Sequence, residues 1–526
     1  MKNLRHMFCV IGMMAGLACP PARAAGTDAI FLDGLPQGAD SALSLKGYFL
    51  PRADDVGRSI SIFAVAILPQ VGAPAYAKTP EGWVAIDLAR PQSVPPLASG
   101  VAAGASHTIE LLPGMDVRTL DGTAIYVGYG VEGASGDAAF LDMVQNTKYR
   151  KVHTLTRSVS MNGPSGLAAC PADISTPLFG TIPVDLENFI AFRPLGFMST
   201  PIHMFPAKHS AFSMTAAGQT AVPKPVKSPA RTVVTEIYEA SFSTGNRNYQ
   251  VFMHPCRELR IYFGHLVTIS EKLQTAFAQG TPQCNSFNDG SATVTTCRRE
   301  NLSIALEEGE IFGTGPDSAG VDFGTLDFRR APAGFIYRAH YDAYYPFYAS
   351  PLDYFTPGVK QAFQAKFGSV FGANRRTVEP VGGTYMQDRA GTAEGNWFLP
   401  GSYHSNTTDL SGFLGLAHDY VDPTQPIMAA GPTIRGMRLG LYSYRTTTSG
   451  LINRDFSQIV ADGNTYCLDA FVEGRSAGEV PVSRPNGILL LSLLNEVTLK
   501  VELIEAASCS VLSNWRYSDN ATVFVR

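Results

Sequence analysis

The chain has 526 residues, and its charged fraction of 16% lies below the roughly 25% of average globular proteins. Its formal net charge of −4 gives no sign of the basic surface by which proteins bind nucleic acid. Glycine (50), proline (35), tyrosine (21) and phenylalanine (30) are abundant, and such a mixture of turn-forming and aromatic residues favours a mainly β protein.

The N-terminus has the pattern of a secretory signal peptide. A positive leader with Lys2 and Arg5 precedes an apolar run over residues 7–18, and the small-residue sequence Ala-Arg-Ala ends at Ala24. The run is shorter than the about 20 residues that a bilayer span needs, and no later run is long enough, so we expect no transmembrane segment. We therefore expect residues 1–24 to be cleaved off and the protein to be periplasmic or secreted.

The cysteines predict disulfides. Cys9 and Cys19 lie in the leader, and an even number remains in a chain that we expect to be exported. Cys284 and Cys297 enclose a polar, turn-rich loop, so a local bridge between them is favoured. A Cys467–Cys509 bridge would join C-terminal strands, which leaves Cys170 to pair with Cys256. The rival hypothesis, a cysteine-bound zinc ion, is less favoured because the sequence lacks the C-x-x-C spacing that is typical of such sites.

Residues 25–159 consist of short β-branched and aromatic runs between Pro/Gly-rich turns, a pattern typical of a β-sandwich. The sequences "TLDGTAIYVGYG" and "MVQNTKYRKVHTL" resemble an Ig-like module found at the front of exported bacterial proteins. That resemblance implies a spacer, or a module that binds carbohydrate or a surface. A turn-rich linker, 160–176, separates this domain from the next.

A second domain is expected over 177–350. Its segments "HMFPAKHSAF", "NYQVFMHPCRELRIYFGHLVTIS" and "EIFGTGPDSAGVDFGTLDF" place a histidine pair, two strands with a histidine at a strand end, and a Gly-rich turn in that order. This order resembles the lysostaphin-type (β-lytic) zinc endopeptidases, most closely at "YFGHLVTIS", which matches a Y-x-H-L-S strand end. The resemblance implies a small antiparallel β fold that cuts peptide cross-links in bacterial cell walls.

The resemblance also implies roles for individual residues. It places His265 as a catalytic histidine and His209 as the leading zinc ligand. The family has an aspartate four residues after that ligand and a final H-x-H, whereas this chain has Ser213 and "DFGTLD". A rebuilt site would use His203, His209 and Asp322 (or Asp327) around zinc with a bound water, and His265 as the base.

Because two ligand positions are substituted, we expect a degenerate domain without zinc, which binds peptidoglycan, another envelope glycan or a protein partner. An active zinc-dependent cell-wall hydrolase with altered ligands is the alternative. A surface adhesin whose Ig-like module carries the binding is a third hypothesis. A glycosidase pair of carboxylates, such as Glu307 and Glu308, also stays open, because such carboxylates need be close only in space.

A β-rich domain with one helix is expected over 351–526. The spacing of apolar residues predicts an amphipathic helix over 357–371. The glycines of "DRAGTAEGNW" predict tight turns that bring Trp397 onto a sheet. His418, Asp419 and Asp422 lie close together in "LAHDYVDP", either as an acid–base or metal site or, as we favour, as polar residues that cap a turn.

Overall fold

The computed structural model describes the chain from residue 29 onward, so the expected signal peptide lies outside the described residues. Beyond residue 28, the residues that it does not describe are 38–41, 69–74, 88–89, 91–93, 105, 118–119, 121, 134–136, 156–165, 217, 289–292, 317–319, 338–339, 343, 401, 403–411 and 513. The protein is mainly β, as the composition predicts, with several sheets of which one is nearly closed into a barrel.

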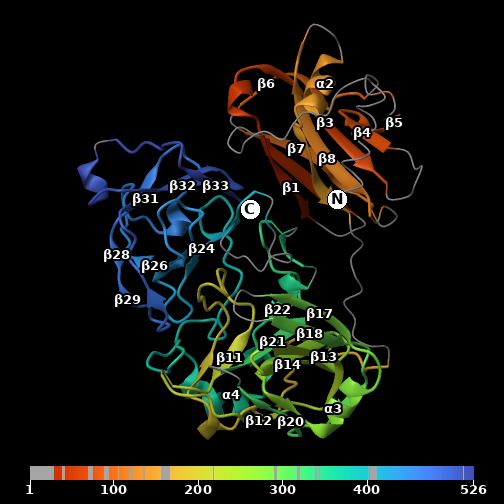
Figure 1. Cartoon of the computed structure of the whole chain (residues 1–526), viewed down its shortest axis with the longest axis vertical. Coiled ribbons are helices and arrows are strands. Elements are labelled where there is room, and N and C mark those ends of the chain that lie inside the picture. The colour runs from red at the N-terminus through yellow and green to blue at the C-terminus, as the bar shows by residue number, and fades with distance from the viewer. Residues whose placement is uncertain are drawn as a thin grey trace. The chain divides into compact units, whose positions relative to one another are not determined.

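The chain divides into two compact units (Figure 1). One contains residues 1–159 with 337–341, and the other contains residues 160–336 and 342–526. The boundary expected between residues 350 and 351 falls inside the second unit, and the separation of a central from a C-terminal domain stays a prediction.

The first unit is an antiparallel β-sandwich. Its strands are β1 (Ile30–Gln37), β2 (Leu43–Leu50), β3 (Ser59–Ile67), β4 (Ala75–Thr79), β5 (Gly82–Ile86), β6 (Ala98–Ala102), β7 (His107–Met115), β8 (Ala124–Val131) and β9 (Tyr149–Thr154). One sheet has the order β1-β2-β7, and the other has the order β5-β4-β3-β8-β9 with β6 paired to β3.

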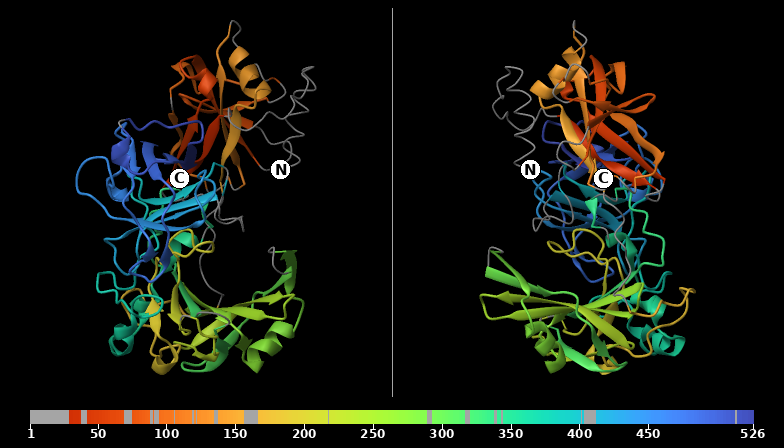
Figure 2. Two further views of the ribbon diagram at one scale, coloured as in Figure 1. Left: turned by 60° about the vertical axis from the view of Figure 1, so that its left-hand side comes forward. Right: turned by 90° about the vertical axis from the view of Figure 1, so that its right-hand side faces the viewer.

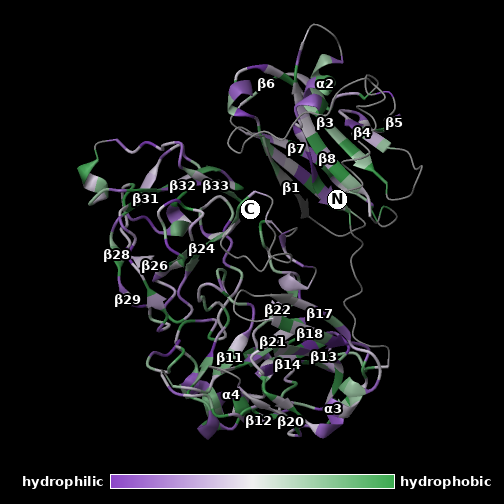
Figure 3. Cartoon of the chain, viewed as in Figure 1, coloured by the Kyte–Doolittle hydropathy of each residue, from purple (hydrophilic) through white to green (hydrophobic). Residues whose placement is uncertain are grey.

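The core of the sandwich is formed by side chains of both sheets, among them Phe49, Leu111 and Tyr129, with Trp83 packed at its margin. Strands β3 and β8 are apolar over much of their length (Figure 3), because both of their faces are covered. Helix α2 (Ala138–Gln145) covers the outer face of these strands with Phe140 and other apolar side chains.

The second unit begins with a large antiparallel sheet, most of whose strands Figure 2 shows in yellow-green to green. Its strands are β10 (Ala191–Arg193), β11 (Ser210–Ser213), β13 (Thr232–Phe242), β14 (Arg247–Cys256), β15 (Leu259–Leu266), β17 (Gln283–Asn288), β18 (Thr293–Arg299), β19 (Ile304–Leu306), β21 (Gly320–Asp327) and β22 (Tyr348–Ala349). The order is β10-β11-β21-β15-β14-β13-β18-β17, with β19 paired to β13 and β22 paired to β21.

A small sheet packs against the large one. It has the order β12-β20-β16, from β12 (Lys224–Lys227), β20 (Ile311–Gly315) and β16 (Thr268–Ile269). Phe312 from the small sheet packs against Phe263 of the large sheet, and Phe263 stacks on Phe323 of the next strand, in a fully buried, aromatic-rich core. This core holds β21 and β15, the two strands that carry the candidate site, in a fixed register.

The rest of the second unit contains a nine-stranded sheet in the order β27-β31-β32-β33-β23-β24-β25-β26-β28, and a separate β29-β30 pair. The strands are β23 (Gly395–Phe398), β24 (Phe413–His418), β25 (Pro426–Ala430), β26 (Gly440–Tyr444), β27 (Tyr466–Leu468), β28 (Phe471–Val472), β29 (Gly474–Arg475), β30 (Pro481–Val482), β31 (Ile488–Asn495), β32 (Thr498–Ile504) and β33 (Thr522–Val525). Trp397 is buried in the core of this sheet, beneath the Arg526 guanidinium, whose carbon lies 4.2 Å from the ring centroid.

Helices contribute little. The α-helices among the described residues are α2, α3 (Glu271–Ala278) and α4 (Pro357–Phe363). Helix α4 lies in the expected segment 357–371 but ends at Phe363, where a 3-10 turn continues the chain. The 3-10 turns are η1 (Ala53–Asp55), η3 (Leu186–Asn188), η5 (Tyr345–Phe347), η6 (Pro351–Tyr354), η7 (Gln364–Lys366), η9 (Phe456–Gln458) and η10 (Cys509–Val511). In the part of the chain that the structure describes, every helix is too short or too polar to cross a bilayer.

Three disulfides link the six described cysteines in the pairing that the sequence favours: Cys170–Cys256, Cys284–Cys297 and Cys467–Cys509. The Cys284–Cys297 bridge joins two residues that face each other in the β17–β18 hairpin. Disulfides persist in oxidising compartments, so the three bridges are compatible with a protein that works outside the cytoplasm.

Candidate functional site

The candidate site lies on three neighbouring strands of the large sheet, in the order β11, β21 and β15, of which Figure 1 labels the first two. The register places Asp322 of β21 opposite Ala211 on one side and opposite Gly264 on the other. His209 directly precedes β11, and His265 follows Gly264 on β15. The two histidines therefore flank Asp322 because of strand pairing alone.

Asp322 contacts both histidines. One carboxylate oxygen, Oδ1, lies 3.4 Å from Nδ1 of His209, and the other, Oδ2, lies 3.5 Å from Nε2 of His265. The side chain of His209 is only 8% exposed, that of Asp322 is 16% exposed and that of His265 is 40% exposed. The group is thus accessible from the His265 side.

His265 has an unusual backbone. Its φ of +61° lies in the left-handed region, which residues other than glycine rarely adopt. Such conformations cost free energy and are found disproportionately at functional sites. The side-chain amide nitrogen of Asn248 lies 3.4 Å from Nδ1 of His265, the ring nitrogen that faces away from Asp322.

His203 joins the same group from a tight turn. Backbone hydrogen bonds in both directions between Ser199 and His203 close this turn. The His203 ring contacts the His209 ring at a centroid distance of 5.2 Å, and the edge of Phe197 packs against both rings. The structure therefore brings together the four residues that the resemblance singles out, His203, His209, His265 and Asp322. We refer to these four as the histidine cluster.

Two of these histidines are held neutral. Burial lowers the pKa of His203 well below its ordinary value, and the nearby charges of Arg193 and Lys208 lower it further. Burial also lowers the pKa of His209, an effect that Asp322 opposes and Arg193 reinforces. Neutral imidazoles each offer one N–H donor and one acceptor.

Arg193 and Lys208 are the site residues that sequence reasoning missed. Arg193 ends β10, and its guanidinium carbon lies 4.4 Å from the centroid of the Phe197 ring. Lys208 directly precedes His209, and its ammonium nitrogen lies 4.7 Å from the Tyr345 ring centroid and 4.8 Å from that of Tyr348. The sequence offered a signal only for Lys208, which is adjacent to His209. The position of Arg193 near the cluster depends on the order of the strands in the sheet, which the sequence alone does not give.

The side chains of the cluster do not match a zinc site. The permanent charges of Arg193 and Lys208 oppose a divalent cation nearby. Within the described residues, no three His, Cys, Asp or Glu side chains are grouped so that they could hold a metal ion.

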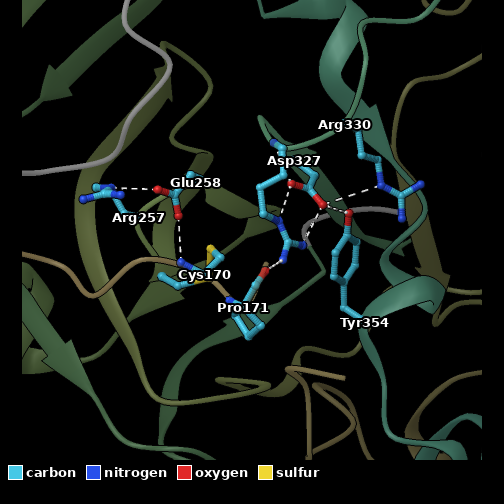
Figure 4. The surroundings of a disulfide bond; sticks show 9 residues. Cys170, Pro171, Arg257, Glu258, Asp327, Arg330 and Tyr354 are labelled. Atoms are coloured by element: carbon cyan, nitrogen blue, oxygen red, sulfur yellow. Dashed lines mark hydrogen bonds and ion pairs between the residues drawn. A yellow bond between two sulfur atoms is a disulfide. The ribbon is translucent and has the colours of Figure 1, made fainter. Parts of the chain in front are cut away.

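Asp327, the other aspartate considered as a ligand, has a structural environment (Figure 4). It is fully buried, accepts hydrogen bonds from Arg329 and from the Tyr354 hydroxyl, and lies 3.5 Å from Nε of Arg330. Burial alone would raise the pKa of Asp327, but these partners hold it below its ordinary value. Its oxygens are thus occupied by fold-stabilising contacts.

The remaining candidates of the central segment also have structural surroundings. Ser213, at the position of the family's aspartate, ends β11 opposite Gly320 with a buried hydroxyl. His254 is buried in β14 two residues before Cys256, and burial lowers its pKa to about 4. Glu308 accepts a hydrogen bond from Thr181 on the exposed surface.

The acidic residues after His418 form turns, as the sequence analysis favours. Asp419 accepts hydrogen bonds from the backbone N–H groups of Val421 and Gly478, and Asp422 accepts from Thr424. These bonds cap the backbone at the end of β24.

His418 itself lies between two carboxylates that the sequence did not connect with it. Its Nδ1 is 3.0 Å from Glu394 and its Nε2 is 2.9 Å from Asp455. Burial alone would lower the pKa of His418, but the hydrogen bonds and charges of the two carboxylates outweigh it and raise the pKa to about 9. His418 is therefore a positively charged, largely buried bridge between two segments.

Comparisons with known proteins add no assignment. No model of a known protein family matches this chain, and no curated protein matches its sequence.

Proposed function

We propose that the chain is an exported cell-envelope protein whose histidine cluster binds a peptide of the envelope, such as the peptide part of peptidoglycan, without cleaving it. The observation that carries the proposal is the convergence of His203, His209, His265 and Asp322, partly open to solvent, at one place on the large sheet. The left-handed backbone of His265, on the solvent-accessible side of the cluster, further supports a functional role.

The chemistry of the cluster suits recognition of a peptide. Neutral imidazoles can donate to a peptide carbonyl or accept from a peptide N–H, and Asp322 fixes the orientation of two of the rings. Cleavage of a peptide bond in the family that the chain resembles relies on zinc, and the residues present do not fit that ion. A site that retains its polar groups but lacks a place for the metal fits a binding module better than a hydrolase.

An active zinc hydrolase is the second candidate. One observation supports it: the His203 ring contacts the His209 ring, and His209 in turn contacts Asp322. The zinc content of the protein separates the two candidates.

Sedimentation with insoluble peptidoglycan tests the proposal. The mature protein, purified without chelator, is expected to co-sediment with peptidoglycan and to release no soluble peptide, and elemental analysis is expected to find no stoichiometric zinc. The His203→Ala/His209→Ala variant is expected to lose binding, whereas His107→Gln, a matched change in the first unit, is expected to keep it. Failure of the wild type to co-sediment would overturn the proposal. About one zinc per chain, lost in the double variant and accompanied by peptide release, would favour the hydrolase.

A further inference from the structure

The Arg193 guanidinium forms no ion pair with a carboxylate among the residues that the structure describes, although the charge of Asp322 acts on it and raises its pKa against the effect of burial. Its Nε is buried without a hydrogen-bond acceptor, and its described contact is with the Phe197 ring. A buried guanidinium normally forms hydrogen bonds to carboxylates or carbonyls, because desolvating its N–H groups without acceptors costs free energy. Arg193 therefore has the character of a group prepared for an anion.

Lys208, the residue before His209, is in a similar situation. Its ammonium group is held over the rings of Tyr345 and Tyr348, and its described contacts include no carboxylate. A cation held by aromatic faces keeps its charge and remains able to donate hydrogen bonds. Both Arg193 and Lys208 lie close enough to the cluster to lower the pKa of His203 and His209.

The charge balance of the site is consequently positive. Asp322 is the carboxylate that faces the cluster, and it is shared by two histidines. Against it stand two permanent cations, Arg193 and Lys208, and histidines that burial keeps neutral. A local excess of positive charge in a partly desolvated site attracts anions and repels cations.

An apolar group borders the same site. Ile202, at the tip of the turn that carries His203, is 73% exposed, although large aliphatic side chains are mostly buried. An exposed isoleucine next to His203 in the chain matches a ligand that has both apolar and acidic groups. A peptide with a free carboxylate has both.

We infer that Arg193 and Lys208 form a carboxylate-binding subsite next to the histidine cluster, and that the ligand is a peptide bound through a free carboxylate. Arginine is suited to this role, because its planar fork can make two parallel hydrogen bonds to one carboxylate. The inference rests on the proposed function for the location of the ligand, but the expected preference for a carboxylate depends only on the two cations.

Calorimetry with the full mature chain tests the inference, with N-acetyl-alanyl-alanine and its C-terminal amide as probes. The acid is expected to bind about tenfold more tightly than the amide or better. Arg193→Met and Lys208→Met are each expected to remove about tenfold of the affinity for the acid and to leave the amide unchanged. Lys360→Met, which removes a lysine of α4, is the matched control.

The outcomes separate this inference from the proposed function. Equal affinity for acid and amide, or no binding of either, would overturn the carboxylate subsite even if peptidoglycan co-sedimented. Tighter binding of a uronic-acid disaccharide than of the peptide acid would overturn the peptide as the source of the carboxylate. Binding of the acid without co-sedimentation would overturn the proposed function alone. If Arg193→Met fails to fold, as judged by its circular dichroism, Lys208→Met decides.

Discussion

Deprotonation of His418 should destabilise the second unit at alkaline pH. In the folded protein its pKa is about 9, against about 6.5 in an unfolded chain. The difference of about 2.5 pH units, at about 1.36 kcal/mol each, corresponds to about 3 kcal/mol of unfolding free energy. Because the folded-state pKa is raised, this contribution is complete below pH 6.5 and is lost as the pH rises through about 9.

The measurement compares wild type with His418→Gln. Urea unfolding, followed by tryptophan fluorescence, gives the free energy of unfolding of both proteins between pH 6 and 9.5. Glutamine can donate to one carboxylate but carries no charge, so the variant is expected to be less stable at pH 6. The difference in unfolding free energy between the two proteins should narrow by about 3 kcal/mol towards pH 9.5. Taking the difference between the two proteins cancels the titration of all other groups.

Parallel stability curves for the two proteins above pH 6.5 would refute the reasoning. They would mean that Glu394 and Asp455 do not hold a proton on His418. A smaller difference in unfolding free energy at pH 6, with the same narrowing towards pH 9.5, would leave the argument intact, because it would change only the part of the difference that does not depend on pH.

Three further outcomes follow from the same structure. Burial lowers the pKa of His254 to about 4. The wild type should therefore lose about 3 kcal/mol of unfolding free energy relative to His254→Gln as the pH falls from 6.5 to 4, because the unfolded chain binds the proton more tightly. A difference in unfolding free energy between the two proteins that stays constant over this range would contradict the prediction. Asp322→Asn removes the charge that raises the pKa of His209, so NMR titration should show a lower pKa for that histidine, and a higher one would be incompatible with the cluster geometry. Replacing Cys284 and Cys297 with serine should cost up to about 3 kcal/mol in urea unfolding, because the bridge closes a short loop, and an unchanged midpoint would show that the hairpin does not limit stability.

The local features of the fold were the ones that the sequence predicted well. The disulfide between Cys284 and Cys297 follows from two cysteines around one turn-rich loop, and Trp397 lies on strand β23 as the preceding glycines indicate. Helix 357–371 was predicted too long. Periodicity continues to Phe367, but regular α-helix stops at Phe363 where the chain tightens into η7.

The site was predictable only where a residue belonged to a recognisable segment. His265 and His209 stood in such segments, whereas Arg193 has no local pattern and reaches the cluster through the β10–β11 pairing. His418 was grouped with its sequence neighbours, but its true partners are 24 and 37 residues away. Such pairings depend on strand order, which a single sequence does not specify.

The disulfide-closed loops 170–256, 284–297 and 467–509 follow one another along the chain without overlap. In a chain that leaves a membrane channel N-terminus first, the second cysteine of each pair is then the next one to emerge. Each thiol meets its correct partner before any competing thiol is outside, so the bridges can close in order of appearance. Such a chain needs an oxidant as it emerges but little later exchange of mispaired bridges, a step that is slow when uncatalysed.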